Sequence, residues 1–272
     1  VSNISNASLF AAGPSVDASG NLTYTPAANA NGTSTFDVQV QDNGGTANGG
    51  DDTSPTVPFT ITVNAVNDEP SFTAGANQTV LEDSGANTSL GWATGISAGP
   101  PDEAGQALTF IIDSNTNTSL FTAGPAVNAT TGDLTYTLAA DANGSATIGI
   151  KLMDNGGTAN GGDNESPVQF FDINVTAVND EPTFVASTPV AVNEDSGAQT
   201  LNNWAAFDPG AANESGQSVV AYTVSNISNA SLFAAAPSVD VNGNLTYTPA
   251  ANANGTSTFD VQVQDDGGTS NG

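Results

Sequence analysis

Internal repetition is the feature that most constrains what this chain can fold into. Asn-Asp-Glu-Pro occurs at residues 67–70 and again 112 residues later at 179–182. Residues 1–49 match residues 224–272 at all but five positions. A period of this length is typical of a tandem array of similar domains, each with its own small core.

The spacing places the unit boundaries directly after Asp68 and Asp180. It predicts a partial repeat over residues 1–68, which holds the C-terminal part of a unit. It predicts a complete repeat over residues 69–180 and a partial repeat over residues 181–272, which lacks the last strand. Because a sandwich without all its strands exposes core and strand edges, we expect neither flank to be a stable autonomous domain. The chain therefore reads as a segment of a longer array.

Within the complete repeat, short runs rich in Val, Ile, Thr, Phe and Tyr alternate with polar residues and end at Asn-Gly and Gly-Gly turns. No stretch has the apolar spacing of an amphipathic helix. The predicted strands lie near Gln78–Glu82, Leu108–Ile112, Leu120–Ala123, Leu134–Leu138, Ala146–Met153 and Val168–Ala177. The pattern predicts an all-β fold of tandem immunoglobulin-like sandwiches.

The charge balance restricts the partners of the chain. There are 28 Asp and Glu residues against a single basic side chain, Lys151, and the net charge is −27. Without a basic patch to neutralise phosphates, nucleic acid and anionic membranes are excluded as partners. Wherever carboxylates cluster, something other than Lys or Arg must offset them, and a divalent cation is the obvious candidate.

The residue types also restrict the chemistry. The chain has no Cys and no His, which excludes a disulfide framework, Ser-His and Cys-His nucleophiles and a zinc site of the usual ligands. Paired carboxylates can run a glycosidase, but the acidic residues here recur once per repeat at linkers and loop ends. That pattern favours a structural, non-enzymatic role. No apolar run approaches the roughly 18 residues of a membrane span.

Four motifs of the complete repeat resemble the C-terminal half of a cadherin repeat. They are Gly132-Asp-Leu, Ala139-Ala-Asp-Ala-Asn, Met153-Asp-Asn-Gly and the linker Val175–Phe184. Glu82 stands where cadherins carry an acidic residue on the first strand. The chain therefore resembles the bacterial cadherin-like repeats of large extracellular adhesins. The resemblance implies a secreted, cell-surface protein with calcium as its cofactor, bound between successive domains.

Carried onto this sequence, the resemblance implies two sets of calcium ligands. At the junction after Asp180 these are Glu82, Asp141, Asn143, Asn179 and Asp180, with Glu214 and Asp265 from the following unit. At the junction after Asp68 they are Asn29, Asn31, Asn67 and Asp68, with Glu103 and Asp154. Calcium binds about six to eight oxygens from carboxylates, amides and carbonyls, which suits these residue types. Ala65 and Ala177 stand where cadherin linkers carry an acid, so about one or two weakly bound ions per junction are expected.

Each feature also has a plainer interpretation that stays open at this point. Asn-Asp-Glu-Pro and Asp-Asn-Gly-Gly are ordinary turn sequences, and the plainer interpretation of Glu82 and Glu194 is a surface carboxylate on a first strand. Trp92 and Trp204 occupy equivalent places in successive repeats. Packing in a core is the favoured interpretation for both, with a sugar-stacking platform as the alternative.

Taken together, these features favour a calcium-stiffened spacer or stalk segment of a large repetitive surface adhesin or fibre. Its partners would be the neighbouring repeats of the same array. Two alternatives remain open. One is a self-assembling filament subunit that receives a strand from another copy. The other is a cell-adhesion module that binds surface polysaccharide or matching repeats on another cell.

Overall fold

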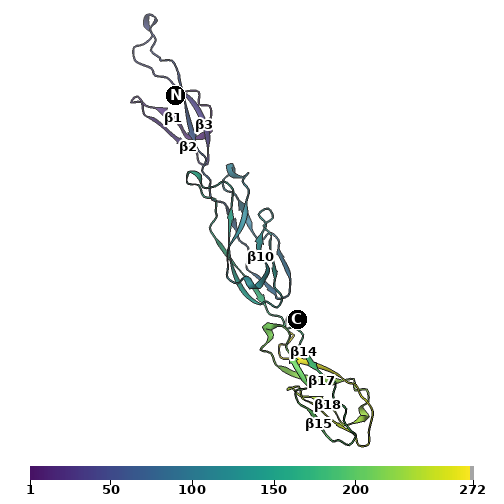
Figure 1. Ribbon diagram of the computed structural model, residues 1–272. Coiled ribbons are helices and arrows are strands. Elements are labelled where there is room, and N and C mark those ends of the chain that lie inside the picture. The colour runs from purple at the N-terminus through teal and green to yellow at the C-terminus, as the bar shows by residue number, and fades with distance from the viewer. Residues whose placement is uncertain (270–272) are drawn as a thin grey trace.

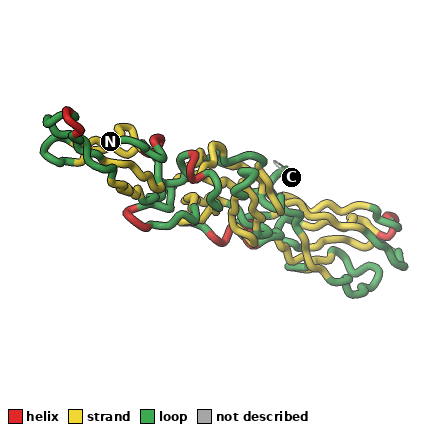
Figure 2. The backbone as a smooth tube through the Cα atoms, turned by 90° about the horizontal axis from the view of Figure 1, so that it is seen from above, coloured by secondary structure: helices red, strands yellow, loops and turns green. Residues whose placement is uncertain are grey.

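The computed structural model describes residues 1–269, which form three β-sandwich units joined end to end (Figure 1). We refer to residues 1–68 as the first unit, 69–180 as the middle unit and the remainder as the third unit. The molecule is also elongated when it is seen from a second direction (Figure 2). The described residues contain no α-helix, which confirms the predicted all-β class. Among residues 1–269 there is also no helix with the length and apolar character needed to cross a bilayer.

The middle unit consists of two main sheets. One has the strand order β6-β13-β12-β9 and the other the order β10-β11-β7, while β5 and β8 form a separate pair. The strands are β5 (Ser71–Thr73), β6 (Gln78–Leu81), β7 (Ala86–Ser89), β8 (Thr94–Ser97), β9 (Thr109–Asn115), β10 (Phe121–Val127), β11 (Leu134–Leu138), β12 (Gly144–Met153) and β13 (Gln169–Thr176). All six predicted strands are confirmed, and β5, β7 and β8 were not predicted.

The core of the middle unit follows from the alternation of its strands. In β11, Leu134 and Tyr136 are buried while Thr135 faces outward, as the period of two requires. Trp92 is only 5% exposed, and its ring centroid lies 4.4 Å from that of Phe171 on β13. The core-packing interpretation of Trp92 is therefore confirmed, and the middle unit offers no sugar platform at this residue.

The flanking units have fewer strands and smaller cores. In the first unit, β1 (Phe10–Val16) pairs with β2 (Leu22–Pro26), and β3 (Gly32–Val38) pairs with β4 (Val57–Val63). In the third unit the strands are β14 (Thr183–Ala186), β15 (Gln199–Leu201), β16 (Ala205–Asp208), β17 (Val219–Ser225), β18 (Phe233–Val239), β19 (Leu245–Pro249) and β20 (Asp260–Asp265). These strands form the sheets β14-β16, β15-β19-β18 and β17-β20.

Short 3-10 turns recur at equivalent positions in successive units. They are η1 (Ala7–Leu9), η2 (Ala47–Gly49), η3 (Pro101–Glu103), η4 (Thr118–Leu120), η5 (Ala159–Gly161), η6 (Ala212–Glu214) and η7 (Ala230–Leu232). Two of them, η3 and η6, lie where their unit receives the chain from the preceding one. Each carries a buried glutamate, Glu103 or Glu214, directly beside the incoming linker.

Candidate metal centres at the unit junctions

The exit end of the middle unit holds a buried acid against the linker. Glu82 is 2% exposed and directly follows β6, which runs parallel to β13. Its Oε1 accepts a hydrogen bond of 2.6 Å from the backbone N–H of Val178, and its Oε2 accepts one of 3.1 Å from Nδ2 of Asn143. Parallel pairing of β6 with β13 therefore brings Glu82 to the linker, and Asn143, just before β12, lies against it.

Three further carboxylates converge beside this acid. Oxygens of Asp83, Asp141 and Asp180 all lie within 4.8 Å of one another. Asp83 and Asp141 both have left-handed backbone conformations, with φ of 60° and 54°, and Oδ1 of Asp83 accepts a 3.0 Å bond from the N–H of Asp141. Aspartate tolerates this region better than most residues do. The two turns therefore fix both carboxylates at one end of the unit.

Burial and the neighbouring negative charges raise the pKa of the Asp180 carboxyl. Burial contributes most, followed by the charge of Glu214 and then those of Asp83, Asp141 and Glu82. The one basic side chain does not help, because Nζ of Lys151 lies 2.8 Å from Glu165 on another part of the unit. The carboxylates at this junction thus repel one another without a compensating protein cation.

The receiving end of the third unit completes this junction. Glu214 and Asp265 are each 6% exposed. The backbone N–H of Asp180 donates to Oε1 of Glu214 at 2.9 Å, and Nδ2 of Asn179 donates to Oδ1 of Asp265 at 3.3 Å. One contact also crosses directly between the units, since Nδ2 of Asn213 lies 3.2 Å from Oε2 of Glu82.

At the junction after Asp68, the linker makes the same kinds of hydrogen bond to the unit that follows it. The N–H of Asp68 donates to Oε1 of Glu103 at 2.8 Å, and Nδ2 of Asn67 donates to Oδ1 of Asp154 at 3.0 Å. Glu103 and Asp154 are 7% and 3% exposed. The contact between units again runs through an amide, with Nδ2 of Asn31 at 3.2 Å from Oδ2 of Asp102.

Several buried oxygens at both junctions have no hydrogen-bond partner among the described residues. They include one carboxylate oxygen each of Glu103, Asp154, Asp180 and Glu214, and the side-chain oxygens of Gln106 and Gln217. A buried carboxylate oxygen without a partner is costly, and such atoms are rare in folded proteins. A set made only of carboxylate, amide and backbone oxygens suits hard divalent cations such as calcium, magnesium or manganese. The residues present therefore fit a hard divalent cation.

Two of the predicted ligands are engaged in a different way. The side-chain oxygens of Asn67 and Asn179 accept bonds of 2.7 Å from Nε2 of Gln106 and Gln217, respectively. Both amides thus hold the linker against the next unit. A Cβ at Gly156 or Gly267 would collide with these Asn side chains, which explains glycine in the Asp-Asn-Gly-Gly and Asp-Asp-Gly-Gly loops.

Other residues of the site were missed or lie apart. Asp83 was missed, although its acidic pair with Glu82 recurs as Glu194-Asp195. Gln106 and Gln217 were missed as well, because nothing in their local sequence marks them. Asn29 shares the left-handed conformation of Asp141, with φ of 56°, but its side chain is exposed.

The fold and the junctions define a tandem array of immunoglobulin-like sandwiches with acid-rich contacts between units. The bacterial Ig domain family matches residues 1–65 and 179–272, more than half of the chain. The chain therefore belongs to the bacterial Ig domain family. No curated protein sequence matches it.

Three cadherin ectodomains are among the similar solved structures. Human desmocollin-1 is 14% identical with a TM-score of 0.40, over 92% of this chain and 50% of that one. Mouse protocadherin-24 EC1-3 is 14% identical with a TM-score of 0.44, over 91% and 75%. Drosophila N-cadherin EC1-4 is 14% identical with a TM-score of 0.39, over 96% and 65%. This chain thus spans half the length of the desmocollin chain.

Proposed function

We propose that this chain is a stretch of a non-enzymatic, calcium-stiffened extracellular spacer, the stalk of a large repetitive adhesin or fibre. The observation that carries the proposal is the set of buried, unpartnered carboxylate oxygens at both junctions, on Glu103 and Asp154 and on Asp180 and Glu214. With one basic side chain in 272 residues, no salt bridge can satisfy both sets. An added cation can.

The residues that would hold calcium come from both sides of each linker. At the junction after Asp180 they are Glu82, Asp83, Asp141, Asp180, Glu214 and Asp265. At the junction after Asp68 they are Asp68, Glu103 and Asp154, with Asp102 beside them. Bound calcium supplies positive charge that several carboxylates can share at once. Without it, the same carboxylates push the two units apart.

The mechanical consequence follows from which atoms would be joined. Glu82 already holds the linker through Val178, and Glu214 holds it through Asp180. An ion shared by these acids would fix the exit end of one unit, the linker and the receiving end of the next. Bending at the junction would then break several oxygen–calcium bonds at once. Extracellular calcium modules work at about 10⁻⁴–10⁻³ M, so weak sites suit a location outside the cell.

Small-angle scattering of the whole chain tests the proposal. With calcium we expect a rigid rod; with EGTA we expect a shorter mean length and a broader range of shapes, while circular dichroism stays that of folded β-sandwiches. The paired variant Glu103→Gln and Glu214→Gln should behave in calcium as the unchanged chain does in EGTA. Asp113→Asn, far from both junctions, is the matched control. Identical scattering with calcium and with EGTA would count against the proposal.

A further inference from the structure

The asparagine of the first linker is enclosed by the receiving end of the middle unit. Asn67 is 9% exposed, and its Nδ2 donates to Oδ1 of Asp154 at 3.0 Å and to the backbone oxygen of Asp163 at 2.6 Å. Its side-chain oxygen accepts a bond of 2.7 Å from Nε2 of Gln106. The donor and the acceptor of this amide therefore both face partners of the right polarity, and all of these partners belong to the middle unit.

Two glycines make room for this asparagine. A Cβ at Gly156 would overlap the side-chain oxygen of Asn67, and one at Gly162 would lie 2.8 Å from its backbone nitrogen. Gly162 has φ of −68° and ψ of 162°, a backbone conformation that any residue adopts easily. Glycine is therefore needed at this position for space and not for conformation. We call Gln106, Asp154, Asp163 and these two glycines the asparagine site.

The backbone of the linker is held by the same unit. The N–H of Asp163 donates to the carbonyl oxygen of Asn67 at 3.0 Å. Nδ2 of Asn160 donates to the carbonyl oxygen of Ala65 at 3.1 Å. Both donors lie in the loop between β12 and β13, which also carries the two glycines. The middle unit thus contacts residues 65–68 as it would a bound peptide, through the backbone as well as the side chain.

The third unit repeats this site around the second linker. The side-chain oxygen of Asn179 accepts a bond of 2.7 Å from Gln217, and its Nδ2 donates to Asp265 at 3.3 Å. A Cβ at Gly267 would again overlap the asparagine oxygen. Residues 65–70 and 177–182 have the same sequence, Ala-Val-Asn-Asp-Glu-Pro. One peptide is therefore held in one way at both junctions.

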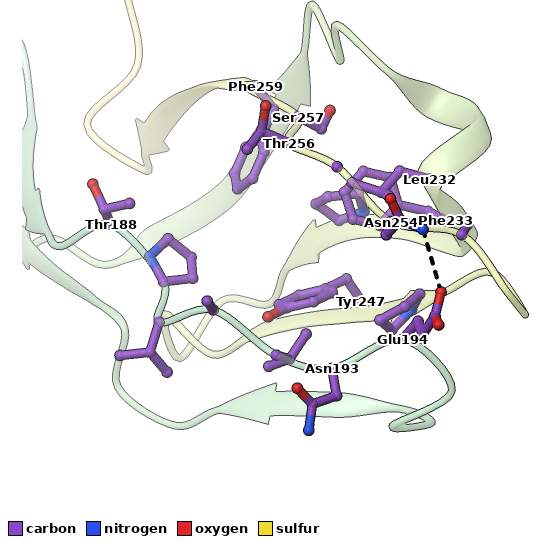
Figure 3. A pocket seen from close by; sticks show the side chains of 18 residues that line it. Thr188, Asn193, Glu194, Leu232, Phe233, Tyr247, Asn254, Thr256, Ser257 and Phe259 are labelled. Carbon is purple, nitrogen blue, oxygen red and sulfur yellow. Dashed lines mark hydrogen bonds between the residues drawn. The ribbon is translucent and has the colours of Figure 1, made fainter.

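The exit side of a linker is held by fewer contacts. Among the described residues of the second linker, the N–H of Val178 donates to Glu82, which also accepts a bond from Asn143 of its own unit. Figure 3 shows the equivalent acid and amide of the third unit, Glu194 and Asn254, with a bond of 3.5 Å between them. The charges of the acids at the exit end of the middle unit also act against the linker aspartate. The linker is therefore bound mainly by the unit that follows it.

We propose that the receiving ends of the middle and third units are peptide-binding sites for the Ala-Val-Asn-Asp linker, selective for its asparagine, which hold the linker without calcium. Linker binding uses Oε1 of Glu103 and Oδ1 of Asp154. The unpartnered Oε2 and Oδ2 of the same side chains stay available for the proposed cation. The two kinds of binding therefore involve different oxygens.

The site selects asparagine over aspartate because of the groups that surround the amide nitrogen. An aspartate in place of Asn67 would turn a carboxylate oxygen toward the carboxylate of Asp154 and the carbonyl of Asp163. Both of these acceptors would lose their donor, and a buried polar group without a partner is costly. Only the bond from Gln106 would remain. A neutral amide is thus the side chain that satisfies all three neighbours.

One consequence, the location of bending, rests on the proposed function. Because the following unit holds the linker at all times, two units would bend where the linker leaves the preceding unit. The carboxylates of Asp83, Asp141 and Asp180 converge at that point. The linker would move as part of the following unit, and a shared calcium ion would join it to the preceding one.

Amide hydrogen exchange of the whole chain in EGTA, followed by NMR, tests the asparagine site. The N–H groups of Asp68 and Asp163 should stay protected without calcium. Asn67→Asp should speed the exchange of both by about 10- to 100-fold, because a buried donor is replaced by an acceptor. Asn43→Asp, at an exposed asparagine of the first unit, is the matched control and should change neither rate. If both N–H groups of the unchanged chain exchange in EGTA as fast as those of an unstructured peptide, the proposal is wrong.

A second variant tests the site without a change of charge. Gly162→Ala places a methyl group against the backbone of Asn67 and should speed the same exchange, while circular dichroism stays that of the unchanged chain. Gly105→Ala is the control, since a Cβ at Gly105 meets no atom within 4 Å. If Gly162→Ala leaves the exchange of Asp68 and Asp163 unchanged, the loop does not form the site and the proposal is overturned.

The second linker allows its two sides to be compared in the same experiment. The N–H of Val178 donates to the preceding unit, and that of Asp180 donates to the following one. In EGTA we expect faster exchange at Val178, and calcium should slow chiefly this group. Equal protection of both groups in EGTA would contradict the location of bending. Exchange that ignores calcium, while Asn67→Asp still releases Asp68, would count against the calcium sites and support the asparagine site.

Discussion

The two junctions share the same hydrogen bonds between the linker and the unit that follows it. They differ in which of the two units supplies one of the acidic residues. At the junction after Asp68, the exit loop carries Asn29 and the receiving turn carries Asp102. At the junction after Asp180, the equivalent residues are Asp141 and Asn213. In each case an amide of one unit donates to a carboxylate of the other, at 3.2 Å in both.

This exchange keeps the carboxylate count of the pair constant. Each junction has one acid and one amide at these two positions, although the acid belongs to the exit loop in one and to the receiving turn in the other. If two units like the middle one followed one another, both positions would be aspartates. If two units like the flanking ones followed one another, both positions would be asparagines. The alternating order thus keeps one acid and one amide at these two positions of each junction, whereas repetition of one unit type would give two acids or two amides.

The largest expected effect separates the two linker aspartates. Asp180→Asn should weaken calcium binding at its junction by roughly 100-fold, because this carboxylate closes a cluster with Asp83 and Asp141. Asp68→Asn should cost about 10-fold, since Asn29 stands in place of the exit-loop aspartate and fewer carboxylates converge there. Isothermal titration calorimetry of each variant gives the affinities. Equal losses at the two junctions would remove the distinction drawn between them.

A charge exchange should show the next largest effect. Asp141→Asn alone should lower calcium affinity after Asp180 by about 10-fold, as one ligand charge is lost. Adding Asn213→Asp recreates the arrangement of the first junction and should recover part of the loss. A double-mutant cycle by calorimetry measures this coupling. Additive losses, with no recovery in the double variant, would show that the two positions do not compensate.

Much of this arrangement could be predicted from the sequence, for identifiable reasons. The repeat spacing and the alternation in segments such as Leu134–Leu138 identify strands without any tertiary information. The strand Ala86–Ser89 could not be found in that way. It is polar and four residues long, and it forms because β11 offers a free edge.

For the acidic residues at the junctions, some features could likewise be predicted from the sequence and others could not. The resemblance to cadherin repeats, carried by the linker and loop motifs, marked Glu82, Glu103 and Asp180 as candidates. The burial of Glu82 and Glu103 and the unpartnered oxygens of Glu103 and Asp180 could not be predicted, because these depend on how the linker packs against the units on either side of it. Gln217 bonds to Asn179 across 38 residues of sequence, and no local pattern indicates that contact.

The smallest expected effect concerns stability without calcium, and its sign is opposite to that of the binding effect. The raised pKa of Asp180 means that the folded chain holds this proton more tightly than the unfolded chain does. The stability from the protonated carboxyl is therefore fully present below the ordinary Asp pKa and is lost as pH rises through the raised value. Asparagine cannot ionise, so in EGTA at neutral pH Asp180→Asn should raise the Tm, on the order of a few degrees.

That gain should vanish in acid, where Asp180 of the unchanged chain is protonated in both the folded and the unfolded state, and should reverse in saturating calcium, where the variant lacks a ligand. Calorimetric melts with EGTA and with calcium, at neutral pH and below the ordinary Asp pKa, separate these cases. Asp240→Asn is the contrasting variant, because hydrogen bonds from Asn244 lower the pKa of Asp240. It should lower the Tm at neutral pH whether or not calcium is present. A Tm for Asp180→Asn that is lower than that of the unchanged chain in EGTA would mean that the Asp180 charge is already compensated within the protein, and a cation would then have little to add at that junction.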